Sequence, residues 1–383
     1  MRWLLYLCRA ALVFVAFSIL SGAGIVSGQT SPGGRRGPGG PPPELPEAKA
    51  IAQPKNEEEL AAAIKQLADD LAAAGKFSGS ILFAAGDKVL VDQAWGEADR
   101  KAKVANTPET AFDVGSIGKL LTQIAILQLA EASKLKLDEP FGKYVTDYPN
   151  QEIAGKVTVR QLMLNTGGIP DAFSNISPGT DLKSMRRLKD FLPLFASKPV
   201  EFEPGSSNRY SSSGYIILGL VIEAVSGQDY FSFVTKEILQ PAGMTHSGFF
   251  DRKQLPATVA RSYDGDEDVT EMHPPRGSSA GGLQVSSGDL FRLVQAVNAG
   301  KLLKKESVRV LRELVPTPPD APPPADDAKL FAYGIGGGAP GISAQVAIDP
   351  QGHFTRVILC NSSPPMDMTM GATIRGWIQK LPK

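Results

Sequence analysis

The first regular hydrophobic pattern in the chain begins just after residue 55. Asn56 followed by Glu59 is typical of a helix start in which the asparagine caps the helix and a glutamate stands three residues later. Apolar side chains then recur every three or four positions, at Leu60, Ile64, Leu67 and Leu71. We expect an amphipathic helix that ends near Gly75 and lies on a sheet.

Alternating polar and apolar positions predict two β-hairpins, one near each end of the folded region. Residues 80–83 and 89–95 alternate around Ala85–Lys88, and residues 342–348 and 355–360 alternate around Asp349–Gly352. A final helix is predicted near residues 368–379. Both hairpins are expected to join one sheet, with the first and last helices packed side by side.

A strongly apolar segment follows residue 116 and has the period of a buried helix. Its apolar positions are Leu120, Leu121, Ile124, Ile126, Leu127 and Leu129. We expect this helix to begin near Ser116 and residues 116–303 to form a mainly helical lobe. Residues 56–383 are thus predicted to form one α+β domain, an antiparallel sheet flanked by N- and C-terminal helices plus this lobe.

The N-terminal residues have the composition of a targeting segment. A basic start is followed by an apolar run over residues 10–20 and by small residues at 21–23 and 26–28. This order predicts a cleaved secretory signal over residues 1–28, with an uncleaved membrane anchor as the alternative. A cleaved signal implies a periplasmic or secreted protein with no stable membrane insertion.

Residues 29–55 are rich in Pro, Gly and Ser and poor in large apolar side chains. Such a segment cannot bury enough apolar surface to order itself, so we predict a disordered linker. A second proline-dense stretch, residues 315–327, precedes the last hairpin and is expected to enter it as a mobile loop.

Composition narrows the function. The 40 Lys and Arg balance the 40 Asp and Glu, so nothing favours nucleic-acid binding. Cys8 lies in the targeting segment and Cys360 stands alone in an apolar strand, which excludes a disulfide framework. The three histidines, His246, His273 and His353, match no zinc spacing, so we expect no metal and no cofactor.

Ser116 and Lys119 are the strongest candidates for chemistry. Residues three apart share one face of a helix, so this hydroxyl and this amine can touch. A serine attacks a carbonyl only when a base accepts its proton, and a buried lysine can be that base when apolar walls favour its neutral form. The backbone N–H groups at the helix start favour the negative charge that develops on the attacked carbonyl.

The chain repeats the Ser-x-x-Lys spacing at Ser133 and Lys136, and this copy is expected to be inert. It lies where the apolar helix ends in a polar stretch before Pro140, so its lysines should be solvated. A second rival is Gly277–Gly281, which fits the Gly-x-Ser-x-Gly pattern of α/β-hydrolases. Prolines precede it and glycines follow it, whereas that motif needs a strand before and a helix directly after.

The segments around Ser116 resemble, in family order, the serine β-lactamase and penicillin-binding-protein-like hydrolases. The likeness is to the branch that holds class C enzymes, D-aminopeptidases and family VIII esterases, and it covers nearly all of the chain after residue 57. The matching segments are residues 77–82, 110–119, 134–140, 157–170, 203–205, 210–215, 241–244, 280–283 and 336–341.

The resemblance implies that Ser116 forms an acyl-enzyme, that Lys119 shares its proton and that Tyr210 acts as a second base. The family's second motif is Tyr-x-Asn. A copy of this motif at Tyr148–Asn150 precedes the matching segment 157–170, which is the wrong order for the family. The family's Asn after Tyr210 is here Ser212, which offers one hydroxyl in place of an amide and should weaken substrate positioning.

The third motif of the family aligns with Ile335, Gly336 and Gly337, so no cation stands at its head. This change argues against substrates that need a salt bridge to a carboxylate. By analogy with the family, the backbone N–H groups of Ser116 and Gly338 form the oxyanion hole.

Two hypotheses remain. The first is an exported serine hydrolase that acts through Ser116 on a small-molecule ester, amide or peptide, an ester or small amide being favoured over a β-lactam. The second is a catalytically weak protein of the same fold that binds cell-wall peptide or a protein partner, for which Ser212 and Ile335 speak.

Overall fold

The computed structural model describes residues 45–382 except 175, 178 and 315–333. These residues belong to one compact unit that spans residues 40–383. The signal predicted over residues 1–28, the first part of the linker and the proline-dense stretch at 315–327 lie outside the described residues.

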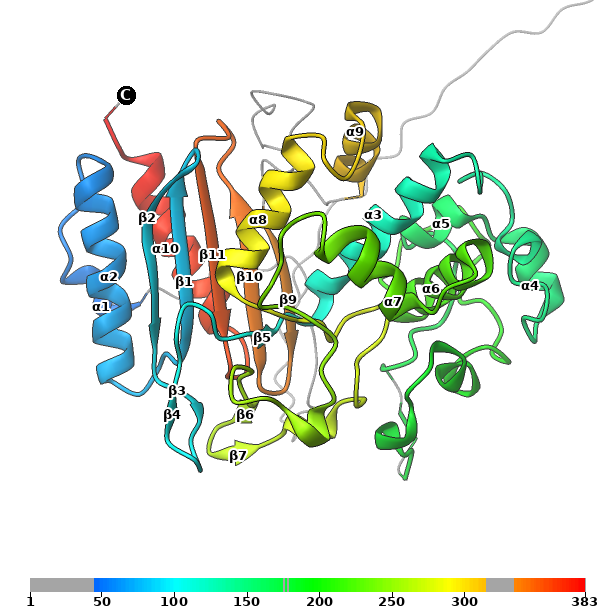
Figure 1. The fold of residues 1–383 in the computed structure, drawn as a ribbon, viewed down its shortest axis with the longest axis horizontal. Helices are drawn as coiled ribbons and strands as arrows, with labels where there is room; N and C mark the ends of the chain where they lie inside the picture. Colours follow the sequence, from blue (N-terminus) through cyan, green and yellow to red (C-terminus); the bar gives the residue numbers. More distant parts are fainter. Residues whose placement is uncertain (1–44, 175, 178, 315–333, 383) are drawn as a thin grey trace, which may run out of the picture. The chain divides into compact units, whose positions relative to one another are not determined.

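A five-stranded antiparallel sheet forms the centre of this unit, with strands in the order β2-β1-β11-β10-β9 (Figure 1). The strands are β1 (Gly79–Ala85), β2 (Lys88–Trp95), β9 (Ile335–Ala339), β10 (Ile342–Ile348) and β11 (Phe354–Cys360). Both predicted hairpins are confirmed, and β1 joins them by pairing with β11. Strand β9, which carries the third motif, lies at one edge.

The two faces of the sheet pack against different helices. Ile81 and Phe83 of β1 join a core with α2 (Glu57–Ala73) and α10 (Met366–Gln379), as the two predicted terminal helices require. Leu82 and Ala84 point to the other face, where α8 (Ser287–Asn298) and the helical lobe cover the sheet (Figure 1). The alternation that predicted the strands therefore holds, with both faces buried.

Two local predictions can be checked by their contacts. The Asn56 side chain accepts a hydrogen bond from the N–H of Glu59 at 2.8 Å, so it caps α2 as expected. The end of the predicted linker, however, packs on the domain. Leu45 is buried, Glu47 pairs with Lys76 at 2.6 Å, and residues 46–49 form the short helix α1 (Pro46–Lys49).

The prediction of disorder up to residue 55 is thus wrong for residues 45–54. Gln53 donates to the carbonyl of Trp377 in α10 at 3.1 Å. Sparse apolar content did not prevent packing, because Leu45, Ala48 and Ile51 lie against the core formed with α2 and α10, and a few polar contacts to the domain add to their hold on this short segment.

The mainly helical lobe is built around α3 (Gly118–Glu131), which is buried on nearly all sides against α6, α7 and α9. Ser116 lies in a 3₁₀ turn, Gly115–Ile117, immediately before α3, so the predicted start is correct within two residues. The other helices are α4 (Gln151–Lys156), α5 (Val159–Met163), α6 (Ser212–Ser226), α7 (Tyr230–Val234) and α9 (Lys305–Glu313).

Short strand pairs connect the lobe to the sheet. They are β3 (Glu97–Asp99) with β4 (Val104–Ala105), β5 (Phe112–Asp113) with β8 (Gln284–Val285), and β6 (Tyr263–Asp264) with β7 (Glu267–Asp268). Within the described part of the chain, no single helix has the length and hydropathy to cross a membrane; α6 and the helical residues 230–239 reach them only together, with a bend of 79°.

Strand β9 lies directly against the turn that carries Ser116, which we call the serine turn (Gly115–Ile117). A Cβ atom on Gly337 would fall 1.9 Å from the carbonyl oxygen of Val114 and 2.9 Å from the amide nitrogen of Ser116. Neither atom belongs to a flexible side chain. The two backbones therefore meet only because Gly337 has no side chain.

We predict that Gly337→Ala lowers the free energy of unfolding by about 2 kcal/mol, because β9 or the serine turn must shift to admit the methyl group. Gly336→Ala is the matched control, since its Cβ would meet only the Ala344 carbonyl at 3.5 Å. Urea unfolding of both variants measures the difference. Equal midpoints would contradict the close contact.

Candidate active site

The serine turn is shaped by the residues immediately before it. Asp113 ends β5, and its Oδ1 accepts a hydrogen bond from the N–H of Gly115 at 2.9 Å. Gly115 then adopts φ +49°, a conformation that side chains disfavour. The serine turn thus places Ser116 immediately before α3, with its side chain half-buried.

A buried ion pair fixes Asp113. Its Oδ2 accepts a hydrogen bond from the Arg252 guanidinium, and both side chains are about 95% buried. Arg252 also donates to the carbonyls of Pro274 and Gly282. Arg252 therefore links the serine turn to the loop formed by residues 274–282. Asp113 and Arg252 are 139 positions apart in the sequence. The sequence analysis missed this pair, since no local pattern links partners so far apart.

Three predicted site residues come together at the serine turn. The Ser116 hydroxyl lies 2.6 Å from the Tyr210 hydroxyl and accepts a hydrogen bond from Lys119 Nζ at 3.3 Å. Tyr210 is thus the nearer partner for the serine proton, and Lys119 approaches the same oxygen from α3.

Lys119 is 7% exposed, so its expected burial is confirmed. Its surroundings differ from those expected. Nζ donates to the carbonyl of Ala280 at 2.5 Å and lies over two aromatic rings, 4.8 Å from the centroid of Tyr210 and 5.4 Å from that of Tyr215. Carbonyl oxygens and ring faces attract positive charge. The sequence predicts apolar side chains around this amine, whereas the structure surrounds it with groups that attract a cation.

Tyr215 lies in the segment 210–215 that resembles the family, and the sequence pattern predicts no role for it. Its hydroxyl accepts a hydrogen bond from Gln123 at 2.6 Å and donates to the carbonyl of Met163 at 2.9 Å. Burial raises the pKa of this phenol, and the Gln123 contact offsets only part of that effect. Tyr215 is therefore a neutral hydrogen-bonding group and not a second base.

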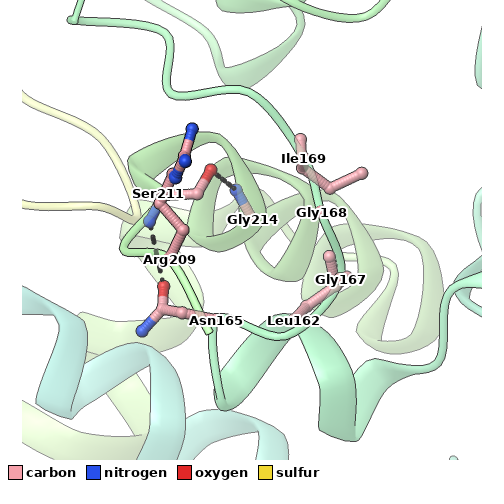
Figure 2. Close-up of a pocket in the computed structure, with 8 residues that line it drawn as sticks. All are labelled: Leu162, Asn165, Gly167, Gly168, Ile169, Arg209, Ser211 and Gly214. Carbon is pink, nitrogen blue, oxygen red and sulfur yellow. Dashed lines mark hydrogen bonds between the residues drawn. The ribbon is translucent and has the colours of Figure 1, made fainter. Parts of the chain in front are cut away.

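A loop between α5 and the next helices holds the segment of Tyr210. Asn165, at φ +58°, accepts from the N–H of Arg209 through its carbonyl at 3.0 Å and from the N–H of Ser211 through its side chain at 3.1 Å (Figure 2). Asn208 donates to the carbonyl of Leu164 at 2.6 Å. These contacts hold the backbone on both sides of Tyr210.

Ser212, predicted to bind substrate, begins α6 and is 7% exposed. Its N–H donates to Asp171 Oδ2 at 2.6 Å, and the next residue, Ser213, donates its hydroxyl to the carbonyl of Pro170 at 2.6 Å. Asp171 was not singled out in the sequence. The Gly-Gly-Ile-Pro-Asp turn that contains it was the available signal, since Asp after such a turn often bonds backbone N–H groups.

A small pocket lies behind this loop (Figure 2). It is lined by Leu162, Asn165, Gly167, Gly168, Ile169, Arg209, Ser211 and Gly214. Ser116, Lys119 and Tyr210 are not among the lining residues. The pocket is therefore formed by the loop and helix residues that hold the segment around Tyr210, and it is not lined by the three candidate catalytic residues.

The third-motif residues lie along β9, with Ile335 half-buried against the core, Gly336 and Gly338 exposed and Gly337 buried. A Cβ on Gly115 would meet the amide nitrogen of Gly338 at 3.0 Å, so this nitrogen lies beside the serine turn. The tight turn after β9 pairs Ala339 with Ile342, and hydrogen-bonded pairs alternate from there. That alternation directs the N–H of Gly338 away from β10, to the side of the serine turn.

The rival motifs lie elsewhere or are inaccessible. Ser279, the serine of the Gly-x-Ser-x-Gly pattern, is completely buried, and no helix follows it directly. Lys134 and Lys136 of the second Ser-x-x-Lys copy are exposed, as predicted. Tyr148 is a core residue packed edge-on against Phe141 at 5.0 Å.

The histidines and the cysteine are dispersed. His246 and His353 are exposed, and the ring of His273 lies 2.9 Å from the carbonyl of Pro340. Burial lowers the pKa of His273. Cys360 is buried and unpaired in β11. Among the residues that the structure describes, no His, Cys, Asp and Glu side chains gather in a group that could hold a metal ion.

Comparison with known proteins places this geometry in a family. The β-lactamase family model matches residues 60–376. The putative penicillin-binding protein PbpX of Bacillus subtilis is 31% identical over 236 residues, which is 60% of this chain and 57% of that protein. The match thus spans little more than half of this relative.

Solved structures with a similar fold support the family match. A penicillin-binding protein from Bacillus halodurans is 30% identical, with a TM-score of 0.70 over 84% of this chain and 99% of that one. A D-amino acid amidase from Ochrobactrum anthropi SV3, 21% identical with a TM-score of 0.68 over 84% of this chain and 99% of its own, shares the fold. The chain therefore belongs to the β-lactamase family of serine hydrolases with a penicillin-binding-protein-like fold.

Proposed function

We propose that this chain is an exported serine hydrolase that works through an acyl-enzyme on Ser116, with an ester or a small amide as substrate. The observation that carries the proposal is the contact of one hydroxyl with two proton-handling groups, at 2.6 Å to Tyr210 and 3.3 Å to Lys119. A serine near a helix start needs no such pair for structure alone.

Acylation begins when the Ser116 oxygen attacks the substrate carbonyl and its proton moves to the Tyr210 oxygen, which is the nearer acceptor and takes the proton as the phenolate. Lys119 lies over the ring of Tyr210 and bonds the serine oxygen, so its positive charge favours the ionised form of both oxygens. Tyr210 then gives the proton to the leaving alcohol or amine. The bond to the leaving group breaks, and the acyl group stays on Ser116.

The negative charge on the attacked carbonyl oxygen needs fixed donors. The N–H groups of Ser116 and Gly338 lie on the two backbones that meet at Gly337, which keeps both in place. In the second half of the reaction a water molecule attacks the acyl group. Tyr210 takes the proton of that water and returns a proton to Ser116, which restores the starting state.

Substrate preference is argued from the residues beside this centre. Ile335 stands at the head of β9, on the same face of the strand as Gly337, and packs partly against the core. An apolar side chain there favours a neutral or apolar group on the substrate over a carboxylate. The D-amino acid amidase of the same fold was solved with L-phenylalanine amide and also with D- and L-phenylalanine, so it supports a small amino-acid amide as substrate, and Ile335 alone argues against a carboxylate.

The nucleophile is tested by labelling with a fluorophosphonate and by hydrolysis of p-nitrophenyl acetate. We expect the adduct on Ser116, and Ser116→Ala should lower turnover at least about a thousandfold, because it removes the oxygen that is proposed to accept the acyl group. Ser133→Ala, in the second Ser-x-x-Lys copy, is the control and should keep wild-type activity. Equal turnover by Ser116→Ala would defeat the enzyme proposal.

The two proton-handling residues are tested separately. Tyr210→Phe and Lys119→Met should each lower the labelling rate by about 10²- to 10⁴-fold, since each removes one group bonded to the serine oxygen. Lys134→Met removes an exposed lysine and should change nothing. Thermal unfolding of every variant separates lost chemistry from lost folding. Labelling of Tyr210→Phe at the wild-type rate would remove Tyr210 from the mechanism.

The role of Ile335 predicts a change of preference. Ile335→Lys should raise kcat/KM for a carboxylate-bearing ester about fivefold relative to its neutral methyl ester, because it adds a cation at the head of β9. Val89→Lys adds the same charge at an exposed position of β2 and should leave the ratio unchanged. The same response from both variants would mean that net charge, and not this position, sets the preference.

The competing proposal is a binding protein of the same fold, supported by Ser212 and Ile335, which depart from the family pattern. Wild-type protein that takes no label on Ser116 but binds peptidoglycan saturably would favour it. Export is part of the proposal and is tested by the mature N-terminus, which should begin shortly after residue 23 or 28 in secreted material.

A further inference from the structure

Tyr215 is the second aromatic ring at Lys119, and the proposed reaction gives it no role. It lies in the first turns of α6, five residues after Tyr210, and is 2% exposed. The Lys119 Nζ atom is 5.4 Å from its ring centroid and 4.8 Å from that of Tyr210. Both distances lie within the range at which a cation is attracted by the face of an aromatic ring.

The hydrogen bonds of Tyr215 hold its ring in place. Its hydroxyl accepts from Gln123 of α3 at 2.6 Å and donates to the carbonyl of Met163 at the end of α5 at 2.9 Å. Gln123 stands four residues after Lys119, on the same face of α3. One phenol thus links the helix of Lys119 to α5 and α6, so the ring cannot move independently of the site.

The Lys119 amine is consequently enclosed by four groups. The Ala280 carbonyl and the Ser116 hydroxyl accept its hydrogen bonds, and the two rings cover it. A lysine side chain has four rotatable bonds and reaches the serine in only a few of its rotamers. A fixed ring face that attracts the ammonium reduces the number of alternatives.

We propose that Tyr215 is a positioning residue whose ring face holds the Lys119 ammonium against Ser116 and Tyr210. This inference rests on the proposed function, since it concerns the group that assists the serine. Tyr215 touches no reacting atom in this arrangement, so it acts only through Lys119.

Other charged and titratable groups near the serine turn must be considered in any pH measurement. Asp113 is paired with Arg252, and His273 lies close enough to both for its pKa to respond to their charges. Tyr210 is a further titratable group that lies against Lys119. None of these four is changed in the variants below.

The test compares ring-free and ring-retaining variants. Tyr215→Leu and Tyr215→Met remove the ring, and Tyr215→Phe keeps it. Tyr230→Leu is the matched control, because Tyr230 is equally buried and its hydroxyl bonds Thr122 of α3 at 2.7 Å, yet Lys119 is not over its ring among the described contacts. Each variant is assayed for fluorophosphonate labelling of Ser116 between pH 5 and 10 and for thermal unfolding.

We expect Tyr215→Leu and Tyr215→Met to lower the labelling rate about tenfold and to move the acid limb of the profile upward by about half a pH unit. The direction follows because a less well-held cation favours the ionised form of Tyr210 less. Tyr215→Phe should lose stability but keep the wild-type limb. Tyr230→Leu should lose stability without moving the limb.

Three results would overturn the proposal. They are a limb at the wild-type pH in both ring-free variants, a rate loss equal to that of Tyr230→Leu, and a shift in Tyr215→Phe as large as in Tyr215→Leu. A crystal structure of Tyr215→Leu gives a readout independent of activity. Lys119 Nζ should leave Ala280, and an unchanged contact would also refute the proposal. If the wild-type protein takes no label, the hydrolase proposal is wrong. The crystal structure of Tyr215→Leu still decides whether Tyr215 positions Lys119.

Discussion

The structure depends on a contact in which two backbones meet with no side chain between them. Gly337 of β9 lies against Val114 and Ser116, where a Cβ would fall 1.9 Å from a carbonyl oxygen. Gly281 approaches Gly115 from the other side, with a Cβ position 2.6 Å from its carbonyl. The serine turn is thus held between the sheet edge and the loop at 274–282. In the proposed reaction the backbone N–H groups of Ser116 and Gly338 are the oxyanion donors, and this confinement holds both groups in place.

The same confinement explains how Lys119 is held. The loop at 274–282 supplies the Ala280 carbonyl, and the ion pair of Arg252 with Asp113 binds that loop to the serine turn. The lysine amine therefore rests on a structure that is itself fixed by the turn that carries the serine. Its surroundings attract a cation, and the proposed reaction therefore uses Tyr210 as the acceptor of the serine proton and Lys119 as the charge that favours the transfer.

Sequence reasoning succeeded where the determining forces are local. The Asn56 cap, the two hairpins and the spacing of Ser116 and Lys119 depend on residues a few positions apart, and each is present. Tyr210 was placed by resemblance. The Arg252–Asp113 pair and the Ala280 carbonyl escaped, because their partners are 139 and 161 residues away and only the fold brings them together. The linker prediction failed at residues 45–54, where composition said nothing about the helix surface available for packing.

The departures from the family pattern lie at other positions than the three groups proposed to transfer protons. Ser116 is hydrogen-bonded to both Lys119 and Tyr210. Lys119 also bonds the Ala280 carbonyl, and Asn165 bonds the backbone on both sides of Tyr210. Ile335 lies at the head of the edge strand β9, and Ser212 is held by its backbone N–H, which donates to Asp171. In the proposed function, a substitution at these two positions changes which substrates bind. It leaves the proposed oxyanion donors in place, because these are backbone N–H groups. Such a division lets recognition vary while the constraints on the chemistry stay fixed.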